Sequence, residues 1–333
     1  MGNELKKLKY APSFISWASV AGKKESEGPL GKLFDICDKS DRFGEDTYEK
    51  SESQMQYSAL NLALSKIRAD DKTLDCIAAG DLMNQCTGSA YGLLPFDTPY
   101  IGLYGACSTC AESLLVSSLL IESEQFMRCA AVCSSHFCSA ERQFRYPLEY
   151  GGQRTPTSQW TVTGAGAFIV DRAGEGPYIT EVLPGRAIDA GITDINNMGA
   201  AMAPAAYDTL KRYFTLSGKK PGDFSLIVTG DLGYEGYSIL LDLMKKDGVD
   251  LSGVLRDCGL MVYERQRQDM HAGGSGCGCS AVTLAAKILP EIKSGALSDV
   301  LFISTGAMMS PASVQQGNSI PGIAHLIHIS NKR

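Results

Sequence analysis

The residue with the clearest chemical potential is a cysteine at a predicted turn. Cys107 follows Gly105 and precedes an apolar stretch, residues 114–121, whose spacing predicts a buried helix. A thiol where the chain enters a helix lies near free backbone N–H groups and the positive end of the helix dipole. We therefore expect a lowered pKa for the Cys107 thiol and a site that attracts an anion.

A second glycine-rich turn, residues 273–279, also leads into a predicted helix and carries Ser275 and Cys277. Cys277 is expected to face the same cavity as Cys107, whereas the other cysteine of this turn is expected to pack in the core. His271 comes just before the turn. Two roles stay open for it: a base for the cavity, or a hydrogen-bonded loop histidine.

Another candidate histidine follows a predicted strand of the first half. Ser135 and His136 come directly after residues 129–134, so they are expected at the carboxyl end of that strand, where sites form in α/β proteins. His136 is either a ligand contact or a structural histidine. The cysteines around it resemble zinc ligands in spacing, but alternating strand positions would not converge, so neither a metal site nor a cofactor is predicted.

Basic and amide side chains that could hold an anion occur in three places. Lys23 and Asn84 each follow a predicted strand, and they either face the cavity or belong to the solvated surface. Residues 141–154 form a basic and aromatic insert that includes Arg142. Two uses stay open for this insert: a cap over the cavity, or a dimer interface.

An internal repeat predicts how these residues are positioned. Residues 77–82 (IAAGDL) recur as residues 227–232 (IVTGDL), and a cysteine-containing turn, a helix and two strands follow each copy in the same order. This order indicates a duplicated unit. The aspartates of the repeat, Asp81 and Asp231, are expected to fix loop backbone N–H groups, because a duplicated position argues for a structural role.

Helical spacing at residues 53–67 and 205–216 alternates with short apolar strands flanked by glycine. This alternation indicates an α/β fold with a sheet covered on both faces. Glycine and proline gather at residues 174–177, so we place the division between the two halves there, giving residues 1–175 and 176–333.

The composition excludes several classes of protein. Of 333 residues, 31 are basic and 37 acidic, a net charge of -6, which is the wrong sign for binding nucleic acid by bulk charge. No apolar stretch approaches the roughly 18 residues of a membrane span, and no secretory signal is visible. Eleven irregularly spaced cysteines indicate reduced thiols and a place inside the cell.

The cysteine turn, the duplicated halves and a glycine-rich loop at residues 305–310 resemble the thiolase and ketoacyl synthase superfamily. The resemblance implies an α/β fold with a five-layered αβαβα core built from two similar halves, and a homodimer. It also implies that Cys107 matches the nucleophile. Acyl-transferring members complete the site with a histidine and an asparagine, but the matching segments, residues 257–260 and 274–275, contain neither, which implies a vestigial nucleophile.

Longer motifs spread over residues 10–328 resemble the stage V sporulation protein AD family, among them GDLMNQ (80–85), GACST (105–109), AERQFRYP (140–147) and GGSGC (273–277). The resemblance implies binding of dipicolinic acid, free or as its calcium chelate, during its uptake into the developing spore. It also implies that membrane proteins of the stage V sporulation A system are partners. Through them the chain would lie at the inner spore membrane of the forespore.

Three functions therefore stay open on the residues alone. The first is a ligand-binding protein without catalytic activity. The second is an acyltransferase or condensing enzyme that uses Cys107 as its nucleophile, which the missing histidine disfavours. The third is a scaffold with a closed pocket, which the small-residue turns disfavour because they leave room for a cavity.

Overall fold

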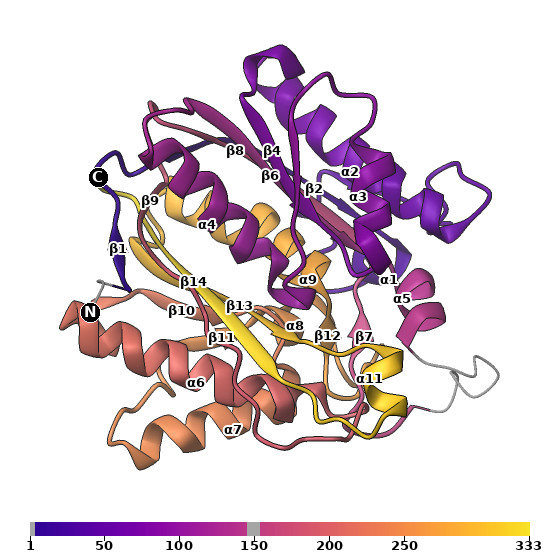
Figure 1. The fold of residues 1–333 in the computed structure, drawn as a ribbon, viewed down its shortest axis with the longest axis vertical. Coiled ribbons are helices and arrows are strands. Elements are labelled where there is room, and N and C mark those ends of the chain that lie inside the picture. Colours follow the sequence, from indigo (N-terminus) through magenta and orange to yellow (C-terminus); the bar gives the residue numbers. More distant parts are fainter. Residues whose placement is uncertain (1–3, 145–153) are drawn as a thin grey trace.

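The computed structural model describes residues 4–144 and 154–333, and one large sheet runs through its centre (Figure 1). Ten strands of this sheet follow one another edge to edge, and two short strands pair at its sides. In spatial order the ten are β11 (Leu255–Asp257), β10 (Leu226–Thr229), β13 (Asp299–Ala307), β14 (Gly322–Ser330), β9 (Tyr178–Leu183), β2 (Ser13–Ala21), β8 (Gly164–Asp171), β6 (Arg128–Ser135), β4 (Cys76–Gly80) and β5 (Tyr100–Gly102).

The strand order is the same in each half of the sheet. In the first half β5, β4 and β6 are parallel, and β8 and then β2 continue antiparallel. In the second half β11, β10 and β13 are parallel, and β14 and then β9 continue antiparallel. The halves meet where Ser13 of β2 pairs with Tyr178 of β9. The repeat in the sequence thus has a counterpart in the topology, while the boundary after residue 175 stays a prediction.

Helices cover both outer faces of the sheet halves and fill the space between them (Figure 1). One outer layer holds α2 (Tyr48–Lys66) and α3 (Thr87–Gly92), and the other holds α6 (Met198–Ser217) and α7 (Gly233–Lys246). The middle layer holds α4 (Thr109–Glu122) and α9 (Cys277–Thr283). The expected five-layered αβαβα core is therefore confirmed.

The outer helices begin earlier than the apolar spacing predicts, because their capping residues lie upstream. The Thr47 hydroxyl accepts the Lys50 N–H at the start of α2, and the Asn197 side chain accepts the Ala200 N–H at the start of α6. Such caps satisfy backbone donors that have no partner within the helix. No helix in the described part of the chain is long and apolar enough to span a membrane.

Short elements complete the fold and position the loops. Strands β7 (Trp160–Thr161) and β12 (Gly274–Ser275) pair with each other and so bring the second glycine-rich turn beside the first half. The remaining elements are β1 (Lys6–Lys7), which pairs with β9, β3 (Ile36–Cys37), which pairs with β2, and the helices α1 (Lys23–Ser26), α5 (Phe137–Phe144), α8 (Cys258–Val262), α10 (Leu289–Lys293) and α11 (Pro311–Gln315).

Candidate functional site

The turn that carries Cys107 is held against a strand of the second half. Residues 106–108 form one 3-10 turn before α4, and Ala106 adopts a positive φ of 51°. Strand β13 passes so close that a Cβ atom on Gly306 would lie 2.4 Å from the Gly105 carbonyl oxygen and 3.3 Å from the Cys107 nitrogen. Glycine at position 306 therefore allows the two backbones to meet and fixes the place of the thiol.

A narrow cavity opens above this turn, with a volume of about 50 Å³. Its walls combine apolar side chains with a few hydrogen-bonding groups, as in sites for small molecules. The lining residues are Leu82, Tyr104, Ala106, Cys107, Ala140, Glu141, Phe144, Ser158, Gln159, Thr161, Ile195, Asn196, Met198, Ser275, Ala307 and Met309.

A buried carboxylate lies beneath the floor of the cavity. The Cys107 sulfur is 3.8 Å from the Ser275 hydroxyl oxygen, and that hydroxyl donates a hydrogen bond of 2.9 Å to Asp231. The Asp231 carboxylate also accepts the Gly276 N–H at 2.9 Å and the Thr305 hydroxyl at 2.8 Å. The floor therefore joins two turns and a strand end through one acidic side chain that is fully buried.

This arrangement suppresses the thiolate form of Cys107. Burial raises the pKa of the Cys107 thiol well above its ordinary value, and the negative charge of Asp231 raises it further. The expectation of a lowered pKa is therefore wrong. Desolvation and the neighbouring carboxylate outweigh the helix terminus, because both disfavour a second negative charge in an enclosed site.

Replacement of the carboxylate offers a test of this electrostatic effect. An Asp231→Asn variant should alkylate more rapidly at Cys107 than the unchanged protein, by about three- to tenfold at pH 8, because loss of the charge lowers the thiol pKa while burial still raises it. The measurement is iodoacetamide labelling followed by peptide mass spectrometry. Asp257→Asn, which removes another buried carboxylate, is the matched control, and equal labelling rates in the two variants would contradict the effect.

Among the residues expected at the site, Cys107 and Ser275 line the cavity and lie together. Cys277 lies in the core beside them, where its thiol donates to the Ser134 carbonyl oxygen at 2.8 Å. Asp257, in the segment that matches the histidine motif, accepts the N–H groups of Leu232 and Gly233 and lies outside the cavity lining.

Three of the expected residues have structural partners away from the lining. The His136 Nε2 lies 2.8 Å from the Asp41 carbonyl oxygen, and burial lowers the pKa of its imidazole. The Ser135 hydroxyl donates to the Val162 carbonyl oxygen at 2.7 Å. The His271 Nδ1 lies 2.7 Å from the Thr155 carbonyl oxygen. Lys23 is exposed at the start of α1. A role for these residues in binding stays a prediction.

Asn84 and Arg142 line a separate, open hollow beside the cavity. Arg142 donates to the Glu49 carboxylate at 2.7 Å, and the Asn84 N–H donates to Gln143 at 2.9 Å. Helix α5 stands between the two spaces, since its Ala140 side chain faces the cavity while Arg142 faces the hollow. The middle of the insert expected to cap the cavity or form an interface, residues 145–153, lies outside the described residues.

The sequence reasoning missed several residues of the site. The loop-fixing role predicted for both aspartates is confirmed, because Asp81 accepts the N–H groups of Met83 and Ser89 and Asp231 accepts that of Gly276. The place of Asp231 beneath the cavity was not predicted. The available signal was the position of Asp231 at the carboxyl end of a central parallel strand. Gln159, which lines the cavity, was also not predicted. Its amide donates to the backbone carbonyl oxygens of Asp231 and Gly274.

The charged side chains that the structure describes in and beneath the cavity are acidic. Glu141 lines it and Asp231 lies beneath it, whereas no lysine or arginine among residues 4–144 and 154–333 forms part of the lining. In the same residues no group of three or more histidine, cysteine, aspartate or glutamate side chains is arranged to hold a metal ion. Among the described residues, an anionic ligand in the cavity would therefore be bound by neutral hydrogen-bond donors, or it would bind together with a cation that neutralises it.

A buried carboxyl in the first half, that of Glu25, makes stability depend on pH. Glu25 accepts hydrogen bonds from Tyr263 and the Thr163 N–H, and burial raises its pKa to about 7. Between its ordinary pKa and pH 7 the folded chain keeps a proton that the unfolded chain has lost. Stability therefore falls as the pH rises through this window.

We expect a Glu25→Gln variant to lose part of this pH dependence. The free energy of unfolding of the unchanged protein should fall between pH 5 and pH 7, by up to about 1 kcal/mol per pH unit for this group, and the fall should be shallower in the variant. Urea unfolding at several pH values measures it. Glu27→Gln, an exposed change two residues away, should keep the original slope; equal slopes for all three proteins would rule the effect out.

Comparisons with known proteins agree with this fold. Residues 2–330 match the family model described as Stage V sporulation protein AD (SpoVAD). The chain is 41% identical over 315 residues to stage V sporulation protein AD of Bacillus subtilis strain 168, which covers 94% of this chain and 93% of that protein.

Several solved structures are similar in fold to this chain but share little sequence with it. They include 3-oxoacyl-[acyl-carrier-protein] synthase III from Aquifex aeolicus, with a TM-score of 0.56 and 14% identity over 95% of this chain and 99% of that one. OleA from Xanthomonas campestris gives a TM-score of 0.62 and 11% identity over 98% and 99%. These likenesses show the thiolase-like fold, and the match over nearly the whole chain shows that the protein belongs to the stage V sporulation protein AD family and has a role in sporulation.

Proposed function

We propose that the chain binds dipicolinate in the cavity above Cys107 and takes part in its uptake into the developing spore, without catalysis. The observation that carries this proposal is a cavity with apolar walls and hydrogen-bonding groups built over a thiol whose ionisation is suppressed. A flat aromatic ring suits the apolar walls, and the Asn196 amide among the lining residues suits its carboxylates. The family resemblance supplies the identity of the ligand.

The charge of the cavity supports the calcium chelate as the preferred form of the ligand. Free dipicolinate is a dianion, and the described lining offers it Glu141 but no basic side chain. Calcium in the chelate would neutralise the ligand and would itself seek further oxygen atoms, which carboxyl and amide groups provide. Binding should therefore be tighter with calcium present than without it.

The same site argues against the alternative, acyl transfer from a thioester. A thiolate is the form that attacks, and in this site both burial and the Asp231 carboxylate disfavour it. The segments that resemble the histidine and asparagine motifs supply an aspartate that lies elsewhere and a serine. We propose that Cys107 serves as part of the cavity floor.

Calorimetric titration with dipicolinate, with and without calcium, tests the function, with acetyl-coenzyme A titrated in parallel. Saturable binding of dipicolinate with no acyl adduct on Cys107 by intact mass is the expected result. Absence of dipicolinate binding in both conditions would overturn the proposal. Transfer of the acetyl group to Cys107 would instead establish the enzyme.

We further propose a homodimer that uses the edge of the sheet at β5. This strand lies at one edge of the sheet, and its residues Tyr100 and Ile101 are each 38% exposed. An edge with apolar side chains is suited to pairing with another copy. Light scattering should give the mass of two chains, and Ile101→Lys should shift it toward one; a monomeric unchanged protein would overturn this proposal.

For its place in the cell, we propose attachment to the inner spore membrane through membrane proteins of the stage V sporulation A system. The support is the family resemblance, together with the finding that no described helix could span a bilayer. Fractionation of sporulating cells checks it: the chain should leave the membrane fraction when those proteins are deleted. Retention in that fraction would count against protein-mediated attachment.

A further inference from the structure

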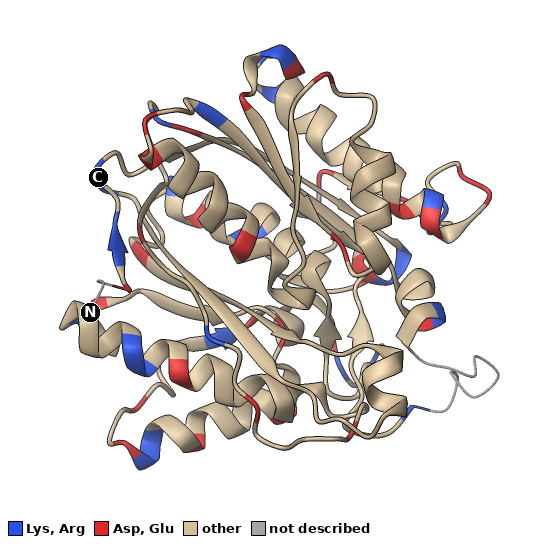
Figure 2. Ribbon diagram, viewed as in Figure 1, with Lys and Arg blue, Asp and Glu red and all other residues tan. Residues whose placement is uncertain are grey.

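A polar hollow lies at the end of the sheet away from the cavity. Both ends of the described chain lie near this end of the sheet (Figure 1). Four basic side chains from three separate stretches line it: Lys7 on β1, Lys219 after α6, and Lys332 and Arg333 after β14. Two acidic side chains, Glu181 and Asp299, face them. Basic side chains thus outnumber acidic ones in the lining. Figure 2 shows basic residues on β1 and at the C-terminal end of a chain whose net charge is -6.

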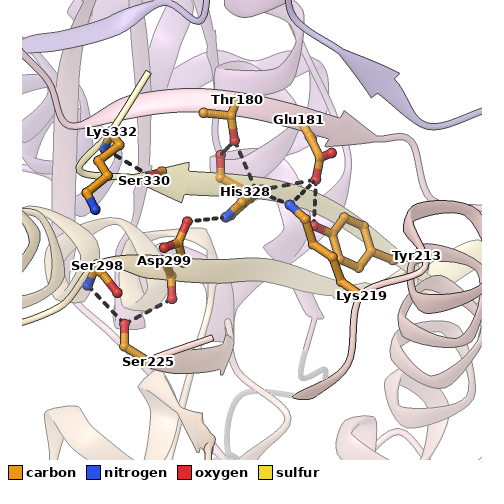
Figure 3. A network of polar contacts seen from close by, with 10 residues as sticks. All are labelled: Thr180, Glu181, Tyr213, Lys219, Ser225, Ser298, Asp299, His328, Ser330 and Lys332. Atoms are coloured by element: carbon orange, nitrogen blue, oxygen red, sulfur yellow. Dashed lines mark hydrogen bonds and ion pairs between the residues drawn. The ribbon is translucent and has the colours of Figure 1, made fainter. Parts of the chain in front are cut away.

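The floor of the hollow is a fixed network (Figure 3). His328 is 4% exposed, and its Nε2 lies 3.1 Å from the Asp299 carboxylate. Glu181 accepts the Tyr213 hydroxyl at 2.6 Å and the Lys219 ammonium at 3.0 Å. Although burial works against the charge, hydrogen bonds from His328, Tyr213 and Lys219 hold the pKa of Glu181 at about 2. The acidic groups of the floor are therefore already matched within the network.

The rim keeps positive charge that the floor does not neutralise. Among residues 4–144 and 154–333, neither the Lys7 nor the Lys332 ammonium has a carboxylate within ion-pair distance. The Arg333 guanidinium donates to a backbone carbonyl oxygen, that of Arg172. Bringing these cations together costs electrostatic free energy, and a compact anion would recover it.

We infer that this hollow binds a phosphate group. Basic side chains from three separate stretches of the chain line one open hollow, and lysine and arginine are the side chains that bind a tetrahedral oxyanion in proteins. The group has two sources: free inorganic phosphate, or the headgroup of an anionic lipid. The site is independent of the dipicolinate proposal, because β13 begins at Asp299 in the hollow and ends at Ala307 in the cavity wall, roughly 26 Å away along the strand.

The test compares two double variants with the same change of charge. K7Q/K332Q removes the two rim lysines, which are exposed, and K72Q/K246Q removes two exposed lysines elsewhere. Binding of inorganic phosphate is measured by calorimetry in a phosphate-free buffer, and binding of phosphatidylglycerol vesicles by sedimentation, with phosphatidylcholine vesicles beside them. Circular dichroism checks that both variants fold.

We expect phosphate to bind the unchanged protein and K72Q/K246Q with the same affinity. Its affinity for K7Q/K332Q should be lower by a factor of about five or more. Lysine-dependent binding to phosphatidylglycerol, competed by phosphate, would identify a lipid headgroup as the source. Phosphate binding without vesicle binding would identify the free ion. If the unchanged protein binds neither probe, or if K7Q/K332Q binds both as well as the control does, the inference is overturned.

Discussion

Asn196→Trp should abolish the binding of dipicolinate, with an affinity about a hundredfold or more below that of the unchanged protein. Asn196 lies on the loop before α6, half-buried, and its side chain lines the cavity. An indole at this position would occupy the space between the apolar walls, and the packed core beneath leaves the ring no room to move inward. Calorimetry with the calcium chelate measures the loss.

Two further variants make this result specific. Asn318→Trp adds an indole at an exposed position outside the lining, and it should bind as the unchanged protein does. Asn196→Ser removes the amide without filling the space, so it should weaken binding far less than the tryptophan. Full affinity in Asn196→Trp, with a normal unfolding curve, would show that the ligand binds somewhere other than above Cys107.

Gly306→Ala should destabilise the fold by about 3 kcal/mol and distort the turn that carries Cys107. A methyl group at this position would lie 2.4 Å from the Gly105 carbonyl oxygen and 3.0 Å from the Ser108 nitrogen. Both atoms belong to backbone, so neither can rotate away. The strand and the turn would have to separate, and both lie in the packed middle of the molecule.

Urea unfolding gives the change in stability, and dipicolinate titration reports the distortion of the turn. Gly222→Ala is the matched control, because no heavy atom lies within 4 Å of the Cβ that it would add. The control should stay within about 0.5 kcal/mol of the unchanged protein. A stable Gly306→Ala variant that still binds the ligand would mean that the close approach of β13 does not position the site.

The architecture could be predicted because its signals are local and repeated. The matching IAAGDL and IVTGDL segments, residues 77–82 and 227–232, each form most of a parallel strand and the turn after it. The first residues of the helices were less predictable. The spacing of apolar residues begins at residue 53, yet α2 begins at Tyr48, because the Thr47 cap and not the apolar face determines the first turn.

The site was predictable only in part, because it depends on contacts between distant segments. Cys107 and Ser275, each expected from its turn, lie 3.8 Å apart and line one cavity, while their role in binding stays a prediction. The direction of the Cys107 pKa shift was predicted wrongly. The sequence shows the helix that follows Cys107, but it does not show the Asp231 carboxylate that the turn after β10 places beneath the thiol. Likewise His136 follows a strand as expected, but its ring nitrogen lies against the Asp41 carbonyl oxygen, a partner from a loop far upstream.

The position of α4 between the sheet halves has a consequence for how the chain is made. One side of the helix packs on β4 and β6, and the other on β13 and β14, which are near the end of the sequence. On a ribosome, where the first half emerges alone, that second side has nothing to cover it, although Leu114 and Ile121 are fully buried in the finished molecule. The nascent first half is therefore an exposed, aggregation-prone species, and the middle layer closes when the last strand leaves the ribosome.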